Sequence, residues 1–497
     1  MPATDDPTHW IQQIAASRSV RSGYASAVWH VLALIVLALL VIPPEVERRP
    51  RAIRLRFAPP AEDAGRDGGG AAVTVAGAAP QQPEEKPPEP AAPQPQPAAP
   101  QAMAVAATVT PPLVAVAEPI VPTPTAAVVA RPASLTRSSE LPAAPSGGTD
   151  AFAPRRGSAR GTTARERGGS AASEAAVDAG LAWLAAHQGE DGSWRCDLSN
   201  CPCRGACRDA GTVTSTTAAT GLALLPFLGA GHTHLEGEHR EVVSRALYYL
   251  LSRLRPTPRG GDLTEGTMYG QGVATLALAE AFGMTRDDML SRPVTDAVRF
   301  IVTAQDTYGG GWRYLPGQPG DTTVTAWQLA ALKSAALAGI EVPTPTIDAI
   351  RRFLDRVQAR AGESYGYQGP QAQPCTSAIG LFCRIHTGWR EADTLDRGLA
   401  ALAKPGPDPQ AVYTNFYLAQ ALLQGNHAAW PKWNRRNRDQ LVAAQARIGH
   451  EQGSWSFADP ETAPGGRLAH TALAVLTLEV YYRLLPVYRP EAVEREW

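Results

Sequence analysis

A carboxylate at the start of one helical run could serve either acid chemistry or helix capping. Residues 309–335 read GGGWRYLPGQPGDTTVTAWQLAALKSA, so a glycine-rich turn precedes Asp321 and a helix-forming run follows it. A carboxylic acid in a dry cavity can protonate a substrate. At a helix N-terminus it can instead accept backbone N–H bonds, which stabilises a helix by about 1 kcal/mol. The neighbours Thr322, Thr323 and Val324 offer no comparable acid, so we expect Asp321 to be an N-cap and the first catalytic candidate.

Two further carboxylates precede another apolar helical run. Asp262 and Glu265 lie in GGDLTEGTMYG, directly before the run that begins near residue 268. A pair of carboxyl groups can divide the roles of general acid and general base. We therefore add both residues to the catalytic candidates, although the sequence does not give their separation.

A cysteine cluster offers either disulfides or a metal site. Cys196, Cys201, Cys203 and Cys207 fall in CDLSNCPCRGAC. Outside the cytosol, two disulfides in any of three pairings are expected. In a reducing compartment the cluster would suit structural zinc, although Cys-x4-Cys-x-Cys-x3-Cys is not a standard zinc spacing. The location argued below favours disulfides, and we expect no cofactor.

Six pairs of helical runs must position these residues. The first run of each pair starts near residues 177, 243, 294, 347, 395 and 438, a spacing of about 43 to 66 residues that is typical of stacked repeats. The second run of each pair is more apolar, which distinguishes inner from outer helices. The pattern predicts an all-α fold, an (α/α)6 toroid of six helix-pair repeats. An open solenoid would need a polar end cap, which the last run, GRLAHTALAVLTLEVYYRLL, lacks.

Loops within some pairs carry a glutamine, a glycine and a tryptophan. Gln188 precedes Trp194 in QGEDGSW, Gln305 precedes Trp312 in QDTYGGGW, and a third copy ends at Trp455. The glutamine amide can cap an outer helix while the tryptophan packs on the next repeat. From about residue 175 to 485 the chain thereby resembles the squalene cyclase and prenyltransferase repeat families, and the resemblance implies the toroid.

The chemistry of those families is not carried over. The cyclase acid lies in an Asp-x-Asp-Asp-Thr-Ala motif, whereas this chain has Thr323 and Val324 in place of the second and third aspartates. In the zinc prenyltransferases the ligands are Asp, Cys and His; the matching positions here are Gln410, Val412 and His470. Only the histidine is present, so the resemblance implies neither alkene protonation nor the family's zinc site.

Polar and aromatic residues at the starts of the inner runs predict a ligand site at one mouth of the ring. Ordinary helix capping is the alternative reading of the same positions. The predicted lining residues are Thr217, Gln271, Thr325, Ser377, Asn415 and His470, with the aromatic side chains of Tyr269, Trp327 and Tyr413.

The N-terminal third predicts a membrane anchor and a tether. Residues 25–42 contain no formal charge and are long enough for one membrane-spanning helix. Ser26 and His30, followed by a proline- and glutamate-rich segment, resemble TonB-type energy-coupling proteins, which implies a proton-channel partner. Residues 43–170 are rich in Pro, Ala and Gly, and this composition predicts a disordered linker.

These features predict four segments, namely 1–24, the anchor 25–42, the linker 43–170 and the toroid 171–490. The arginines after the anchor favour a cytosolic toroid, whereas a long proline tether suits reach across an envelope, and we favour the extracytoplasmic side. Because 46 Lys and Arg nearly balance 47 Asp and Glu, no basic field indicates nucleic-acid binding.

The expected function is a membrane-anchored, non-catalytic toroid that binds a lipid, glycan or protein ligand in the cell envelope. One alternative is an enzyme that acts on an isoprenoid or another lipid with a non-standard acid. The other is a TonB-like coupling protein that acts through Ser26 and His30.

Overall fold

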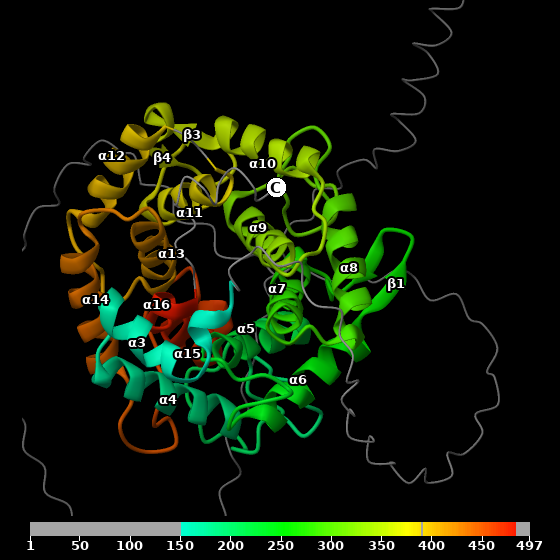
Figure 1. The fold of residues 1–497 in the computed structure, drawn as a ribbon, viewed down its shortest axis with the longest axis vertical. Helices are drawn as coiled ribbons and strands as arrows, with labels where there is room; N and C mark the ends of the chain where they lie inside the picture. The colour runs from blue at the N-terminus through cyan, green and yellow to red at the C-terminus, as the bar shows by residue number, and fades with distance from the viewer. Residues whose placement is uncertain (1–150, 389–390, 484–497) are drawn as a thin grey trace, which may run out of the picture. The chain divides into compact units, whose positions relative to one another are not determined.

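Six outer and six inner helices alternate along the chain and form a ring (Figure 1). The computed structural model describes residues 151–388 and 391–483. The outer helices are α4 (Ala171–Ala186), α6 (Arg240–Arg253), α8 (Asp288–Thr303), α10 (Thr344–Val357), α12 (Ala392–Ala403) and α14 (Trp430–Ala444). The inner helices are α5 (Thr216–Gly229), α7 (Met268–Thr285), α9 (Thr322–Leu337), α11 (Pro374–His386), α13 (Val412–Gln424) and α15 (Gly466–Leu478).

The two sets of helices differ in how their residues are buried. In the outer helix α10 the buried side chains include Ile347, Ile350 and Leu354, which share one face at helical spacing. In the inner helix α7 nearly every residue from Met268 to Met284 is buried. This difference confirms the assignment of outer and inner runs that the sequence predicted.

The ring closes on itself. Each inner helix packs against the next, and α15, the last of them, packs against α5, the first. Figure 1 shows the same order around the ring, with α5 and α15 side by side. The described residues therefore form a closed α/α toroid rather than an open solenoid.

The glutamine–tryptophan loops join neighbouring outer helices. The amide of Gln188 donates to the carbonyl of Val242 in α6 at 3.0 Å. The amide of Gln305 donates to Thr346 in α10, also at 3.0 Å. Gln445, the displaced glutamine of the third copy, donates to Ala176 in α4 at 2.8 Å. This third bond connects α14 to α4, the last outer helix to the first.

The tryptophans of these loops hold the C-terminal ends of the outer helices. The indole N–H groups of Trp194, Trp312 and Trp455 each donate to a carbonyl in the last turns of the preceding outer helix, in every case at 2.8 Å. All three side chains are fully buried. Carbonyls in the last turn of a helix lack some of their intrahelical partners, so each tryptophan adds a hydrogen bond to one such carbonyl while filling the space between repeats.

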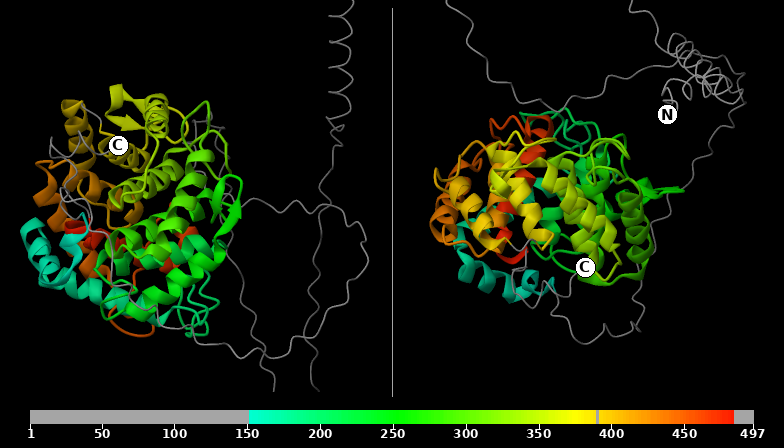
Figure 2. Two further views of the ribbon diagram at one scale, coloured as in Figure 1. Left: turned by 45° about the vertical axis from the view of Figure 1, so that its right-hand side comes forward. Right: turned by 90° about the horizontal axis from the view of Figure 1, so that it is seen from above.

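Two short β-hairpins depart from the all-α expectation. Strand β1 (Arg255–Thr257) pairs with β2 (Gly260–Asp262), and β3 (Gln358–Ala359) pairs with β4 (Ser364–Tyr365), both antiparallel. The first hairpin contacts α8 and projects at the rim of the ring (Figure 2). Each hairpin lies in the connection between an outer helix and the following inner one. In the first hairpin Gly260 adopts a positive φ of 128°, which favours glycine.

The folded region begins earlier than the sequence indicated. Residues Ala153–Arg155 form the 3-10 helix η1, and Gly157–Arg167 form α3, within the segment expected to be linker. Helix α3 contacts α16 (Val480–Arg483), as the neighbouring ribbons in Figure 1 show. The last part of the expected linker is therefore an element that packs on the ring.

No helix within residues 151–388 and 391–483 is both long and apolar enough to cross a membrane. The expected anchor at 25–42, with Ser26 and His30, lies outside the described residues. The membrane and proton-channel partners consequently stay predictions.

Candidate functional site

The carboxylate of Asp321 is the N-cap of α9 and is fully buried. Its Oδ1 accepts hydrogen bonds from the backbone N–H of Val324 and the hydroxyl of Thr323, both at 2.8 Å. Its Oδ2 accepts from the hydroxyl of Tyr367 at 3.0 Å and lies 3.9 Å from Nε of Arg313. The predicted capping role is thus present, and the second carboxylate oxygen faces a phenol instead of backbone.

Burial raises the pKa of Asp321, although the bonds from Val324, Thr323 and Tyr367 and the charge of Arg313 partly oppose this shift. A carboxyl group in such surroundings holds its proton to a higher pH than an exposed one does. Perturbed acids of this kind are found at functional sites more often than elsewhere.

Three phenols surround this acid. The hydroxyls of Tyr314 and Tyr367 are 3.1 Å apart, and that of Tyr269 lies 2.7 Å from Thr323 Oγ1. Burial, and then the proximity of Tyr413 and Asp321, raises the pKa of Tyr269. Tyr269 was a predicted lining residue. Tyr314 and Tyr367 come from loops, whose sequences carry no periodic signal, and were not predicted.

An aromatic cluster continues from this acid along the inner helices. The indole N–H of Trp327 donates to the hydroxyl of Tyr413 at 2.9 Å. The Trp327 ring also stacks on Phe416 with centroids 5.9 Å apart, and Tyr417 lies edge-on to Tyr413 at 5.2 Å. The predicted aromatic residues Trp327 of α9 and Tyr413 of α13 therefore belong to one packed cluster, whereas Tyr269 of α7 contacts α9 through Thr323.

A second pair of carboxylates lies in the connection between α14 and α15. Oδ2 of Asp459 accepts from the backbone N–H of Tyr413 at 2.9 Å, and Oδ1 accepts from the N–H of Glu461 at 3.0 Å. Burial, and then the charge of Asp459, raises the pKa of Glu461. Since Asp459 is committed to two backbone bonds, Glu461 is the half-buried carboxylate of this pair that is better placed to meet a ligand.

The six polar positions that were expected to line the mouth form hydrogen bonds with backbone groups of the segments between helices. Gln271 bonds to Leu263 and to Gly261, and Thr325 bonds to Trp312. The other four contacts are Thr217 with Leu263, Ser377 with Tyr365, Asn415 with Asp408, and His470 with Phe457. These contacts fit the capping alternative, because each side chain satisfies a backbone group of a neighbouring loop.

The two other catalytic candidates are parts of turns. Oδ1 of Asp262 accepts from the N–H of Thr264 at 2.8 Å. Glu265 receives the N–H groups of Thr216 and Thr217 and pairs with Arg253. Burial alone would raise the pKa of Glu265, but these bonds outweigh burial and lower it. Glu265 is therefore an ionised cap at the start of α5, and an ionised carboxylate has no proton to donate.

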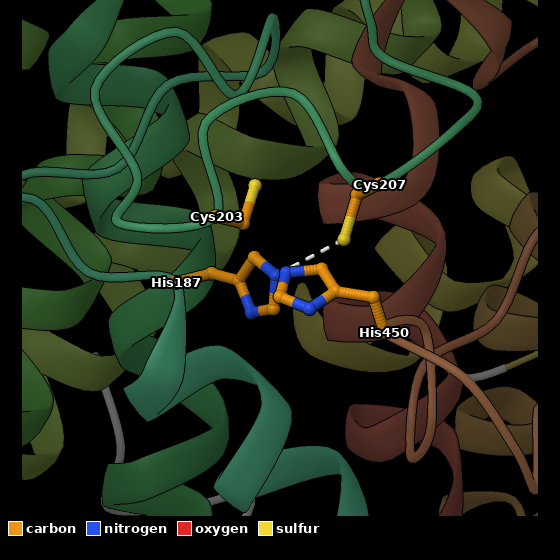
Figure 3. A group of neighbouring side chains, drawn as sticks. All are labelled: His187, Cys203, Cys207 and His450. Carbon is orange, nitrogen blue, oxygen red and sulfur yellow. Dashed lines mark hydrogen bonds between the residues drawn. The ribbon is translucent and has the colours of Figure 1, made fainter.

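Four possible metal ligands converge near the start of the ring. His187, Cys203, Cys207 and His450 each offer one ligand atom, and these atoms all lie within 4.8 Å of one another. Figure 3 shows the two imidazole rings next to each other, with the sulfur of Cys207 directed toward them. The four residues come from the end of α4, from the loop that follows it, and from the loop after α14. Neither histidine was predicted as a ligand, because His450 is remote in sequence from the cysteines.

The cysteine arrangement differs from the expected two disulfides. Cys201 and Cys203 form one disulfide, whereas Cys196 and Cys207 are buried thiols. Burial raises the pKa of Cys196 to about 12, which keeps this thiol protonated. Cys207 lies 3.0 Å from Nε2 of His187 instead of bonding another cysteine.

No protein-family model and no curated protein matches this sequence. Among solved structures, an inactive variant of the GH76A α-1,6-mannanase of Salegentibacter sp. HEL1_6, in complex with α-1,6-mannotetrose, aligns with a TM-score of 0.46 and 10% identity over 63% of this chain and 99% of that one. The glycoside hydrolase family 76 mannosidase Bt3792 of Bacteroides thetaiotaomicron gives 0.43 and 12%, over 64% of this chain and 100% of that one.

A type II terpene cyclase from Scytonema, with bound geranylgeranyl dihydroxybenzoate, is also similar. It gives a TM-score of 0.39 and 16% identity over 63% of this chain and 97% of that one. The resemblance to cyclases therefore holds only at the coarse level of an α/α toroid.

The comparisons also correct the expected function. The sequence predicted a non-catalytic, membrane-anchored toroid, with an isoprenoid-acting enzyme or a TonB-like protein as alternatives. The non-catalytic part of that prediction is corrected by the similar structures, which include several glycoside hydrolases. At these identities the similarity extends to the fold alone, so the reaction must be argued from this chain's own residues.

Proposed function

We propose that this chain is an enzyme that acts on a carbohydrate, with Asp321 as its proton donor. The observation that carries the proposal is the buried Asp321 carboxyl, one oxygen of which contacts only the hydroxyl of Tyr367 and the more distant Arg313. A substrate oxygen that displaces this hydroxyl would meet an acid whose pKa is raised by burial. General acid catalysis requires such a group within hydrogen-bond reach of the oxygen that is protonated.

The surroundings of Asp321 suit a polyhydroxylated ligand. Tyr269, Tyr314 and Tyr367 offer hydroxyls that can both donate and accept hydrogen bonds. Trp327 and Tyr413 bring aromatic rings close to the starts of α9 and α13, and the C–H faces of a sugar ring can pack against aromatic side chains. An isoprenoid chain, by contrast, offers no hydrogen-bonding group to these hydroxyls.

Glu461 is the candidate for the second carboxylate. Glycoside hydrolysis needs two carboxyl groups, one that protonates the leaving oxygen and one that activates water or attacks the sugar. The Asp459–Glu461 turn bonds to Tyr413, which bonds to Trp327 of α9, the helix that Asp321 caps. Glu461 is thus linked to the helix that Asp321 caps through Asp459, Tyr413 and Trp327.

Product analysis on the full chain tests the proposal. Purified wild-type protein would be incubated with α- and β-linked oligosaccharides, with α-1,6-mannotetraose first, and shortened products would be measured by mass spectrometry. We expect Asp321→Asn to lose at least about 100-fold in rate, as for removal of a general acid, and Glu461→Gln to be similarly impaired. Asp262→Asn, which alters a turn carboxylate, is the matched control and should retain the wild-type rate.

Thermal melting of each variant separates catalysis from folding. Asparagine is also a good N-cap, so Asp321→Asn should melt no lower than the wild type. No product from any carbohydrate, or an Asp321→Asn variant with the wild-type rate, would show that the proposed function is incorrect.

A further inference from the structure

We infer that His187, Cys203, Cys207 and His450 bind one Zn2+ ion, which joins the first repeat of the ring to the last. This inference is independent of the proposed carbohydrate chemistry, because it concerns different residues. Two imidazole nitrogens and two sulfurs are the donor set of many structural zinc sites.

The spacing of the four side chains suits tetrahedral coordination. Their ligand atoms all lie within 4.8 Å of one another, and Nε2 of His187 is 3.0 Å from Sγ of Cys207. In a tetrahedral site with Zn–S near 2.3 Å and Zn–N near 2.0 Å, ligand atoms are separated by about 3.3 to 3.8 Å. Small rotations of side chains would therefore bring all four atoms to one ion.

A bond outside the cluster already orients His187 for this role. Its Nδ1 lies 2.7 Å from the carbonyl oxygen of Trp183, one turn earlier in α4, so Nδ1 carries the proton and donates it there. The His187 ring also stacks on the Trp183 ring, with centroids 4.0 Å apart. Nε2 is left with its lone pair directed at the cysteines (Figure 3). Metal-binding histidines typically use their second nitrogen in this way.

The position of the site explains what the ion would do. Cys203 and Cys207 lie in the segment 188–215, which connects α4 to α5 without a helix or strand, and His450 lies in the loop after α14. Polar contacts already cross this junction: Arg208 pairs with Glu451 at 3.0 Å. A connection this long without secondary structure needs other interactions to order it, and zinc would bind it directly to the last repeat.

Four protein ligands leave no position open for a substrate. Catalytic zinc sites keep one coordination position for water, whereas structural sites fill all four with protein atoms. The site is therefore assigned a stabilising role, and its loss should lower the melting temperature without removing a catalytic group.

The disulfide between Cys201 and Cys203 controls access to the site. Zinc needs Cys203 as a thiolate, so the ion and the disulfide exclude each other. A dithiol reductant would supply two electrons and two protons to the disulfide, giving two thiols and its own oxidised form. Cys203 and Cys207 would then each release a proton as they bind the ion. Replacing Cys201 with serine removes the competing partner and leaves all four ligands in place.

Zinc content of the full chain provides the test. Protein treated with dithiothreitol, incubated with Zn2+ and freed of excess ion should contain one zinc per chain by elemental mass spectrometry. His450→Ala, which alters an exposed side chain, and Cys207→Ser should lose at least about 100-fold in zinc affinity, since even outer-sphere partners contribute 10- to 100-fold. Cys196→Ser, in the same loop but outside the cluster, is the matched control and should bind zinc as the wild type does.

Two further measurements separate this site from adventitious metal. Co2+ in place of zinc should show the visible bands of tetrahedral coordination with thiolate ligands, and these should be absent from His450→Ala. Cys201→Ser should bind zinc without reductant, whereas the wild type should require it. The inference would be overturned if the folded, reduced wild type bound no stoichiometric zinc, if His450→Ala bound it equally well, or if Cys196→Ser lost it.

Discussion

Under the proposed function, Asp321 combines two roles that the sequence treated as alternatives. One carboxylate oxygen caps α9 through Val324, and the other faces the Tyr367 hydroxyl. The capping bond fixes the position of the carboxyl group, while burial raises its pKa. A cap that is also a positioned acid needs no second aspartate beside it, and this explains how Thr323 and Val324 can occupy the next positions.

The pH dependence of stability follows from the raised pKa of Asp321. The folded chain holds this proton more tightly than the unfolded chain does. The protonated carboxyl therefore contributes fully to folding stability below the ordinary Asp pKa near 4, and this contribution is lost as the pH rises through the pKa of the folded state. Asp321→Asn lacks the titration. The melting temperature of the variant should therefore rise relative to that of the wild type as the pH increases from about 4. The difference between the two should become constant above the pKa of the folded state.

Glu265 supplies the opposite case in the same experiment. Its pKa is lowered in the fold by Thr216, Thr217 and Arg253. The melting temperature of the wild type should therefore rise relative to that of Glu265→Gln as the pH rises. A constant difference between wild type and Asp321→Asn from acidic to neutral pH would contradict the assigned shift.

The polar positions of the inner helices show what the sequence could and could not predict about the site. Their types and spacing predicted side chains at one end of the ring, but not the direction of their hydrogen bonds. Loops supply many unpaired backbone groups, and side chains such as Gln271 and Ser377 satisfy them. Conversely, Tyr314 and Tyr367 reach Asp321 from loops, where no periodicity could place them.

The glutamine–tryptophan loops act between elements. Gln305 and Gln445 each donate two hydrogen bonds, one within their own loop and one to the next outer helix. Replacing either glutamine with alanine leaves two carbonyls without this donor, and we expect a loss of about 1 to 3 kcal/mol in unfolding free energy. Urea unfolding of the full chain measures the effect, with the exposed Gln452→Ala as the control. A loss no larger than that of the control would contradict this role.

Periodicity predicted the twelve helices of the ring because each has a strong apolar pattern over three or more turns. It did not predict the hairpins β1–β2 and β3–β4, which have strands of two or three residues. Such strands are too short to show an alternating pattern, and their formation depends on packing against α8 and α11.

At the scale of the whole molecule, a buried charge network connects the N-terminal arm, which comprises η1 and α3 (residues 153–167), to the ring. Arg155 and Arg483 each lie 2.7 Å from an oxygen of Glu280, and all three side chains are buried. Burial alone would raise the pKa of Glu280, but the two arginines lower it. Arg155 belongs to a segment whose proline- and arginine-rich composition predicted solvated linker, because composition cannot show that a carboxylate elsewhere needs a partner.

Removing one partner of such a network should be costly. Arg155→Ala leaves Glu280 with a single arginine partner, and we expect a loss of about 3 to 5 kcal/mol in unfolding free energy. Arg165→Ala, in the same arm but exposed, should have little effect. Thermal and urea unfolding of the full chain measure both, and equal stability of the two variants would show that the arm is not part of the folded unit.

Closure of the ring through α5 and α15 has a consequence for biosynthesis. Helix α5 is buried along most of its length, yet α15, which covers one side of it, leaves the ribosome after all the other inner helices of the ring. Until then the nascent chain exposes an apolar strip that invites aggregation. Translation of the second half of the ring is thus the period in which this chain depends most on chaperones, and slow codons placed after α5 would lower its yield more than slow codons placed after α15.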